Sequence, residues 1–242
     1  MRHVRSSLWA AAIAAGFLVT GCSLVTAAPG ANQQASVPIP AARGAAIIGS
    51  SLVSMAKRLH TYQIKAEETL VSGTHTSVVN YFGSFSLPDS LDLDETLAGV
   101  NYRIVQLGSR AYVGAGSVYA VTRPIPVLTP WTGLARLLAA DPPKSVAQLP
   151  DQTILSWICN VYQFTEPVPS GWLGVSAASL SPGLPKEALY TVWIDRQDND
   201  LRQLEIQSTT GISGIGTVAM TAVQTYDAFN APVHVSLPKS VS

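Results

Sequence analysis

Charged residues are scarce in this sequence, and neither sign is in excess. Lysine, arginine, aspartate and glutamate make up 12% of the 242 residues, against roughly 25% in an average soluble domain. The 15 basic side chains are balanced by 15 acidic ones and are scattered along the chain. A nucleic-acid partner is excluded, because no basic face is available to neutralise phosphates. The shortage of charge indicates either a large core or apolar surface around an internal cavity.

Cysteine is almost absent, and the motifs of common enzymes are missing. The two cysteines are Cys22 and Cys159. We expect Cys159 to be a small buried apolar residue. The sequence contains no HExxH, CxxC or GxSxG motif and no phosphate-binding glycine loop. We therefore expect no enzyme activity, no metal site and no cofactor. A site assembled from residues that are distant in sequence stays open as the alternative.

An acidic group and a glycine group resemble ligand-binding loops in composition but not in spacing. The acidic group Asp89, Asp92, Asp94 and Glu95 lacks the glycine and the terminal glutamate of a calcium-binding loop. We interpret it as a solvated loop. The glycines between residues 211 and 216 have no dinucleotide-binding spacing, and we expect a turn between strands there.

The longest apolar run near the amino terminus is too short to cross a membrane. It extends over the 12 residues from Leu8 to Val19 and follows Arg2 and Arg5. A bilayer-spanning helix needs about 20 apolar residues, whereas a signal peptide has an apolar region of this shorter length. The run ends in Val19-Thr20-Gly21-Cys22, which resembles the lipobox of bacterial lipoproteins. The resemblance implies that residues 1–21 are removed and that Cys22 carries lipid.

A lipid on Cys22 implies a durable membrane anchor. Two or more acyl chains hold a protein on a bilayer, where one chain does not. We expect residues 22–40, which contain Pro29, Pro38 and Pro40, to form a flexible tether. Residues 41–242 then form a single domain at the extracytoplasmic face of a membrane in the cell envelope. Without Arg2 and Arg5 this mature chain has 13 basic and 15 acidic residues, a net charge of −2.

Two helices are predicted from apolar residues spaced three and four apart. Ile48, Leu52, Met55 and Leu59 share one face of a helix over residues 41–60. In a second helix, Thr129 is suited to the N-cap and Pro130 to the first helical position. This helix ends near Asp141, and its apolar face carries Trp131, Leu134, Leu137 and Leu138.

Elsewhere apolar and polar residues alternate, which is typical of antiparallel strands with one buried face. Residues 198–200 are the turn of a hairpin, 166–187 form an irregular stretch, and a last strand is possible at 233–237. This order predicts an α+β domain with helices against one face of a curved antiparallel sheet. If the sheet curves around a cavity, one parity of each strand faces inward, namely Ile64, Val79, Tyr81, Phe85, Tyr102, Ile104, Val192, Ile194, Leu204, Ile206 and Met220. Trp131, Leu134 and Leu138 would close the cavity, while the alternative is that all these residues form an ordinary core.

Three segments resemble the LppX/LprG lipoproteins of mycobacteria and their relatives. They are the stretch from Val127 to Leu138, the hairpin over residues 191–206, and the end of the chain from Pro232 to Pro238. Thr129 stands where that family usually has aspartate, and residues 144–187 match poorly. The resemblance implies the fold of the LolA/LolB carriers, a half-open antiparallel barrel whose concave face is covered by helices. In the family a cavity between sheet and helices binds acylated lipids or glycolipids.

These observations lead to one expected function and one alternative. The expected function is a membrane-anchored lipoprotein that carries an acyl lipid or glycolipid across the envelope, with a membrane transporter as a candidate partner. The alternative is an envelope interaction or sensor lipoprotein with a filled core and no lipid ligand.

Overall fold

The computed structural model describes residues 36–125, 127, 129–167, 187–212 and 216–238, which all belong to the unit Gln34–Ser242. The predicted signal peptide, Cys22 and most of the predicted tether lie outside the described residues, as does most of the irregular stretch 166–187. The described elements follow one another along the chain as β1 (Val37–Ile39), α1 (Ala41–Arg58), β2 (Thr61–Ser72), β3 (His75–Ser86), β4 (Ser90–Leu97), β5 (Val100–Leu107), β6 (Arg110–Ala115), β7 (Val118–Thr122), α2 (Pro130–Ala140), β8 (Val146–Ile154), β9 (Trp157–Glu166), β10 (Ala188–Asp195), β11 (Leu201–Ile212) and β12 (Gly216–Asp227).

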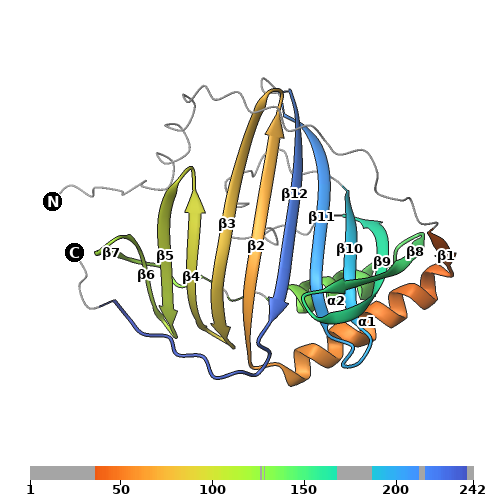
Figure 1. Ribbon diagram of the computed structural model, residues 1–242, viewed down its shortest axis with the longest axis horizontal. Helices are drawn as coiled ribbons and strands as arrows, with labels where there is room; N and C mark the ends of the chain where they lie inside the picture. Colours follow the sequence, from red (N-terminus) through yellow and green to blue (C-terminus); the bar gives the residue numbers. More distant parts are fainter. Residues whose placement is uncertain (1–35, 126, 128, 168–186, 213–215, 239–242) are drawn as a thin grey trace. The chain divides into compact units, whose positions relative to one another are not determined.

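The described strands form one open antiparallel sheet (Figure 1). Its order is β1-β8-β9-β10-β11-β12-β2-β3-β4-β5-β6-β7, so β1 and β7 are the two edges. Most neighbours in the sheet are also neighbours in sequence and are joined as hairpins. The exceptions are β1, which pairs with β8, and β2, which pairs with β12 and thereby connects the run β2–β7 to the run β8–β12. The predicted class, an α+β half-barrel with a curved antiparallel sheet, is confirmed.

Both helices lie on the same side of the sheet, at one end of it. Figure 1 shows α1 and α2 under β8–β11, at the opposite end of the sheet from β4–β7. The predicted apolar stripe of α1 is confirmed, because Ile48, Leu52 and Met55 are fully buried. In α2 the fully buried residues are Trp131 and Leu134. We call the helix-bearing side of the sheet the inner face and the opposite side the outer face.

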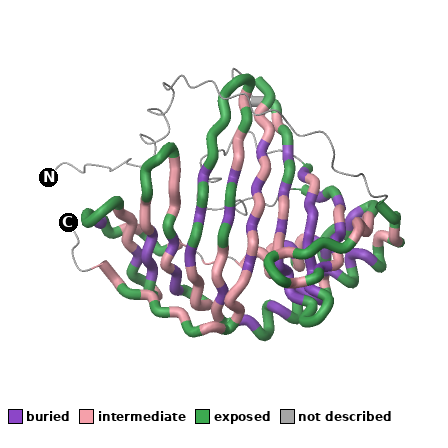
Figure 2. The backbone as a smooth tube through the Cα atoms, viewed as in Figure 1, coloured by how far each residue is buried: buried purple, intermediate pink, exposed green. Residues whose placement is uncertain are grey.

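The buried inner-face residues form two clusters. The first cluster joins the helices to β8–β12 and to Tyr62 of β2, and includes Leu204, Ile206 and Tyr226. The second cluster lies on β2–β5 and consists of Ala66, Val79, Tyr81, Leu91, Leu93 and Ile104. Figure 2 shows that the far ends of β2 and β3, by contrast, are largely exposed.

A smaller cluster lies on the outer face and contains Cys159. This residue is fully buried with Val161 and Trp193. Burial raises the pKa of the Cys159 thiol to about 11, so the thiolate, which is the reactive form, is disfavoured at neutral pH. The prediction of a small buried apolar residue is confirmed.

Three sequence-based expectations differ from the structure. Val37–Ile39, expected within the tether, form β1, because their backbone pairs with residues 146–148 of β8. Asp92, Asp94 and Glu95 do not form a solvated loop but lie in β4, where the buried residues Leu91 and Leu93 alternate with them. Residues 233–237 are not a strand, although half-buried and exposed residues alternate there, because no neighbouring strand pairs with them in the described sheet.

Candidate functional site

The eleven strand residues predicted to face inward all lie on the inner face. Directly paired residues of neighbouring antiparallel strands share a face. One such row runs through Leu93 and Ile104, and another through Val192 and Leu204. The pairings of β2 with β3 and β12, and of β11 with β12, place the other predicted residues on the inner face in the same way. Their contact with a lipid stays a prediction.

The structure divides the predicted residues between the two clusters. Trp131, Leu134, Leu138, Val192, Ile194, Leu204, Ile206 and Met220 belong to the first cluster. Val79, Tyr81 and Ile104 belong to the second cluster, and Ile64 and Phe85 pack against both. Tyr102 is half-buried and belongs to neither. The sequence pattern predicted the face correctly but contained no information about this division.

The first cluster is densely filled by aromatic side chains. The Tyr62 ring stacks on Phe85 with 4.7 Å between ring centroids and meets the edge of Trp131 at 4.8 Å. Trp131 in turn lies 6.0 Å from Tyr226. These separations fall in the range of favourable aromatic pairs. The first cluster therefore acts as the core that attaches α1 and α2 to the sheet.

The second cluster is apolar but lies away from the helices. Its partly buried neighbours include Ile125 and Val127, which belong to the connection between β7 and α2. Phe85 and Ile64 form its border with the first cluster. A continuous layer of buried and half-buried apolar residues thus extends from the helix-covered core across β2–β5 to the connection that leads into α2.

In the inner-face rows of the described strands, the charged side chains are carboxyl groups. Glu68, Glu95 and Glu166 lie in inner-face rows, whereas Lys65 and Arg103 point to the outer face. Burial raises the pKa of Glu95, and burial with the nearby Asp141 and Glu187 raises that of Glu166. Sequence reasoning missed Glu68 and Glu166 and interpreted Glu95 as part of a solvated loop. Glu68 has the same parity as Ile64 and would have been found by extending that alternation.

An open groove of about 470 Å³ lies at β9–β12. Most of its lining comes from the outer face, where Thr165, Leu189, Gln207 and Thr221 are successive cross-strand neighbours. Met220 is the predicted residue that also lines it. The groove is therefore separate from the second cluster, and it gives no support to a cavity among the other predicted residues.

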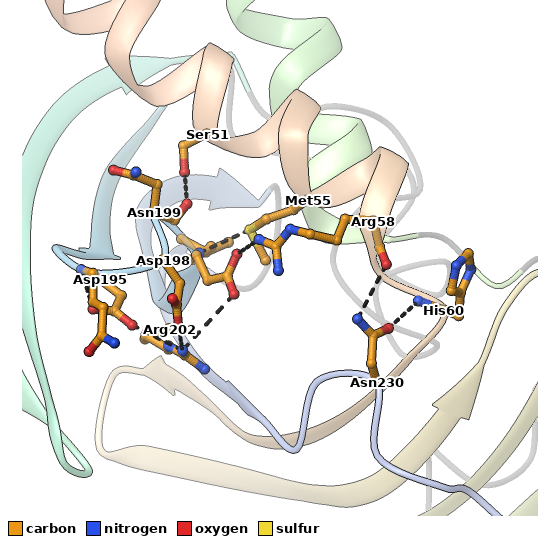
Figure 3. Close-up of polar contacts among 12 residues, drawn as sticks. Ser51, Met55, Arg58, His60, Asp195, Asp198, Asn199, Arg202 and Asn230 are labelled. Carbon is orange, nitrogen blue, oxygen red and sulfur yellow. Dashed lines mark hydrogen bonds and ion pairs between the residues drawn. The ribbon is translucent and has the colours of Figure 1, made fainter.

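A polar network fixes α1 to the turn between β10 and β11 (Figure 3). The hydroxyl of Ser51 donates to the carbonyl of Asn199, and Arg58 pairs with Asp200. The guanidinium of Arg202 lies 3.0 Å from Asp195 and 4.0 Å from Asp200, and all three side chains are at most 5% exposed. The Trp157 ring lies 3.9 Å from the same guanidinium. This end of α1 is thus held to the sheet by buried charges as well as by packing.

The amino-terminal end of α2 contains an unsatisfied polar group. Thr129 is the N-cap residue, as predicted, but its hydroxyl bonds to Thr132 Oγ1 instead of a helix amide. The first turn has no acidic residue. Trp131 is 0% exposed, and within the described part of the chain its indole Nε1 has no hydrogen-bond partner.

Among the described residues, no helix has the length and apolarity that a membrane span requires. No protein-family model and no curated protein matches the sequence.

Solved structures with a similar arrangement exist, at low sequence identity. LprF from Mycobacterium bovis is 12% identical with a TM-score of 0.50, over 82% of this chain and 98% of LprF. The lipoprotein LppX from Mycobacterium tuberculosis is 14% identical with a TM-score of 0.48, over 79% of this chain and 98% of LppX. A LolA-superfamily protein from Nitrosomonas europaea is 12% identical with a TM-score of 0.32, over 78% and 94% of the two chains. The similarity to LprF thus confirms, at the level of the fold, the resemblance inferred from sequence.

Proposed function

We propose that this protein is a membrane-anchored lipoprotein of the cell envelope that binds an acylated lipid or glycolipid on its inner face and carries it across the envelope. The observation that carries the proposal is the second cluster. It consists of buried apolar residues on inner-face strands away from both helices, and Ile64 and Phe85 connect it to the first cluster. Such an apolar lining suits a flexible hydrocarbon chain better than a compact polar ligand.

Burial of an acyl chain supplies enough free energy for binding. A chain of about 16 carbons gains roughly 12 kcal/mol gross when it leaves water, at about 0.8 kcal/mol per methylene. Part of this gain is lost because the chain and the surrounding side chains become ordered. The absence of lysine and arginine from the inner-face rows of the described strands disfavours a strongly anionic ligand.

The proposed carrier needs a membrane anchor but no catalytic step. Cys22 would hold the chain at the extracytoplasmic face, and residues 22–36 would tether the domain. A carrier binds and releases its ligand without making or breaking bonds, so the proposal requires no catalytic residue, metal or cofactor. A membrane transporter would be the partner that supplies or accepts the lipid.

The filled first cluster supports a second candidate function. Leu134, Leu201 and Leu204 are completely buried among their neighbours. If the whole inner face packs in this way, the protein is an envelope interaction or sensor lipoprotein without a lipid ligand. The two candidates predict different responses when inner-face residues are enlarged.

Enlarging second-cluster residues should block lipid without unfolding the protein. Val79→Trp and Ile104→Trp each put a large ring where we propose that the acyl chain lies. We expect each to lower the free energy of unfolding by less than about 1 kcal/mol and to reduce bound lipid several-fold. The matched control is Leu204→Trp, in the first cluster, where overpacking should cost about 1–3 kcal/mol. All three residues are at most 3% exposed in the wild type.

Urea unfolding and extraction of bound lipid measure both effects on the same preparations. If Val79→Trp and Ile104→Trp lose as much stability as Leu204→Trp while bound lipid is unchanged, the second cluster is an ordinary core. That result would favour the interaction or sensor function.

A further inference from the structure

A buried hydrogen-bond donor in the first cluster lacks an acceptor among the described residues. Trp131 Nε1 is completely enclosed and has no partner within the described residues. Buried tryptophan N–H groups usually have a partner, and an unsatisfied one is costly because its bond to water is lost. By contrast, the buried indole of Trp193 on the outer face donates to Gln152 Oε1 at 3.0 Å.

The position of Trp131 suggests what the missing acceptor is. Trp131 is the second residue of α2, directly after the connection whose Ile125 and Val127 pack on the second cluster. Its ring touches Tyr62, which stacks on Phe85, and Phe85 packs against both clusters. An acyl chain that extends from the second cluster past Phe85 would reach the surroundings of this indole.

The amino-terminal end of α2 adds a second attraction for an acceptor. The first N–H groups of a helix and its dipole give this end a partial positive charge. No side-chain cap and no acidic residue in the first turn compensates it. A hydrogen-bond acceptor beside Trp131 would be stabilised by both features.

The surroundings favour a neutral acceptor over an anionic one. Burial raises the pKa of Tyr62 and of Tyr226, both of which contact Trp131. The same aromatic environment makes it costly to bury a phosphate, because no cation is among these ring contacts. A carbonyl oxygen accepts a hydrogen bond without this cost.

We propose that Trp131, at the amino-terminal end of α2, binds the ester carbonyl of the acyl lipid, with the indole Nε1 donating to the carbonyl oxygen. This inference rests on the proposed function and adds the ligand class: the ligand is an acyl ester, and the ester linkage itself is recognised. A lipid with the same chains in ether linkage lacks the carbonyl and binds more weakly.

Two lipids that differ only in having ester or ether linkages test the ester site. The full chain, purified from membranes in a non-ionic detergent, is offered equal amounts of dioleoylglycerol and its dioleyl ether analogue, and native mass spectrometry gives the ratio bound. We expect the wild type to prefer the ester about fivefold or more, and Trp131→Phe to bring the ratio close to one while ether binding is unchanged. Trp193→Phe, the matched control on the outer face, should keep the wild-type preference.

A second measurement uses the wild-type protein, so it tests the ester site even if Trp131→Phe does not fold. With ¹⁵N-labelled tryptophan, the Trp131 indole signal should shift on addition of the ester lipid and much less on addition of the ether lipid. An equal ratio in the wild type, a preference that persists in Trp131→Phe, or an indole signal indifferent to the linkage overturns the ester site. Binding of neither lipid by the wild type overturns the proposed function instead.

Discussion

Replacing Arg202 with methionine should lower the free energy of unfolding by about 3–5 kcal/mol, because it leaves the buried carboxylate of Asp195 without a cation and that of Asp200 with Arg58 alone. Asp195 and Asp200 are each only 3% exposed, and Arg202 lies against both. Burial already raises the pKa of Asp200 even though Arg58 and Arg202 act to lower it. Loss of Arg202 removes one of these two opposing cations and frees the turn that holds α1.

Urea unfolding of Arg202→Met and of a matched arginine variant measures the effect. Arg103 pairs with Asp92 through two hydrogen bonds of 2.7 and 2.6 Å, but its side chain is 42% exposed. Arg103→Met should therefore cost less than about 1 kcal/mol. Equal, small losses for both variants would show that the Arg202 network does not hold α1 to the sheet.

Replacing Cys22 with alanine should abolish membrane anchoring, since the thiol is the predicted attachment point of the lipid. We expect the variant to accumulate as an uncleaved precursor and to lose all label from a palmitate analogue fed to the cells. Cys159→Ala is the matched control, because Cys159 is buried in the outer-face cluster and should not be acylated. Label that persists on Cys22→Ala would contradict the anchor.

The sequence correctly predicted which side chains of a strand lie on the buried face of the sheet, because apolar residues on that face recur at every second position. Val79, Tyr81 and Ile104 lie on the predicted face, and the stripe of Ile48, Leu52 and Met55 is buried as expected. In β4 the acidic residues favoured the prediction of a loop. The alternating leucines Leu91 and Leu93 indicate the strand that is observed.

Other features depend on contacts that are distant in sequence. Val37–Ile39 form a strand only because β8 offers a free edge more than 100 residues later. Strand β8 itself contains Pro150 and a register shift between Leu149 and Gln152, which obscure its alternation. The alternation also cannot distinguish the two clusters, because it identifies the buried side of a strand but not what covers that side.

The candidate site was therefore predicted as one set of residues where the structure has two. Leu204 and Val79 have the same sequence signature and similar burial, yet Leu204 packs in the helix-covered core and Val79 in the second cluster. The polar atom at Trp131 is equally invisible in the sequence, since a tryptophan on the apolar face of a helix predicts packing and not an unsatisfied donor.

Native mass spectrometry of the full chain, purified from its own membranes in a non-ionic detergent, tests most directly whether the protein binds lipid. We expect a species heavier than the covalently lipidated chain by the mass of one acyl lipid, which is released intact when the collision energy is raised. Val79→Trp should carry less of this lipid than Leu204→Trp. A single mass for the covalently lipidated chain, both as purified and after incubation with dioleoylglycerol, would contradict the carrier function.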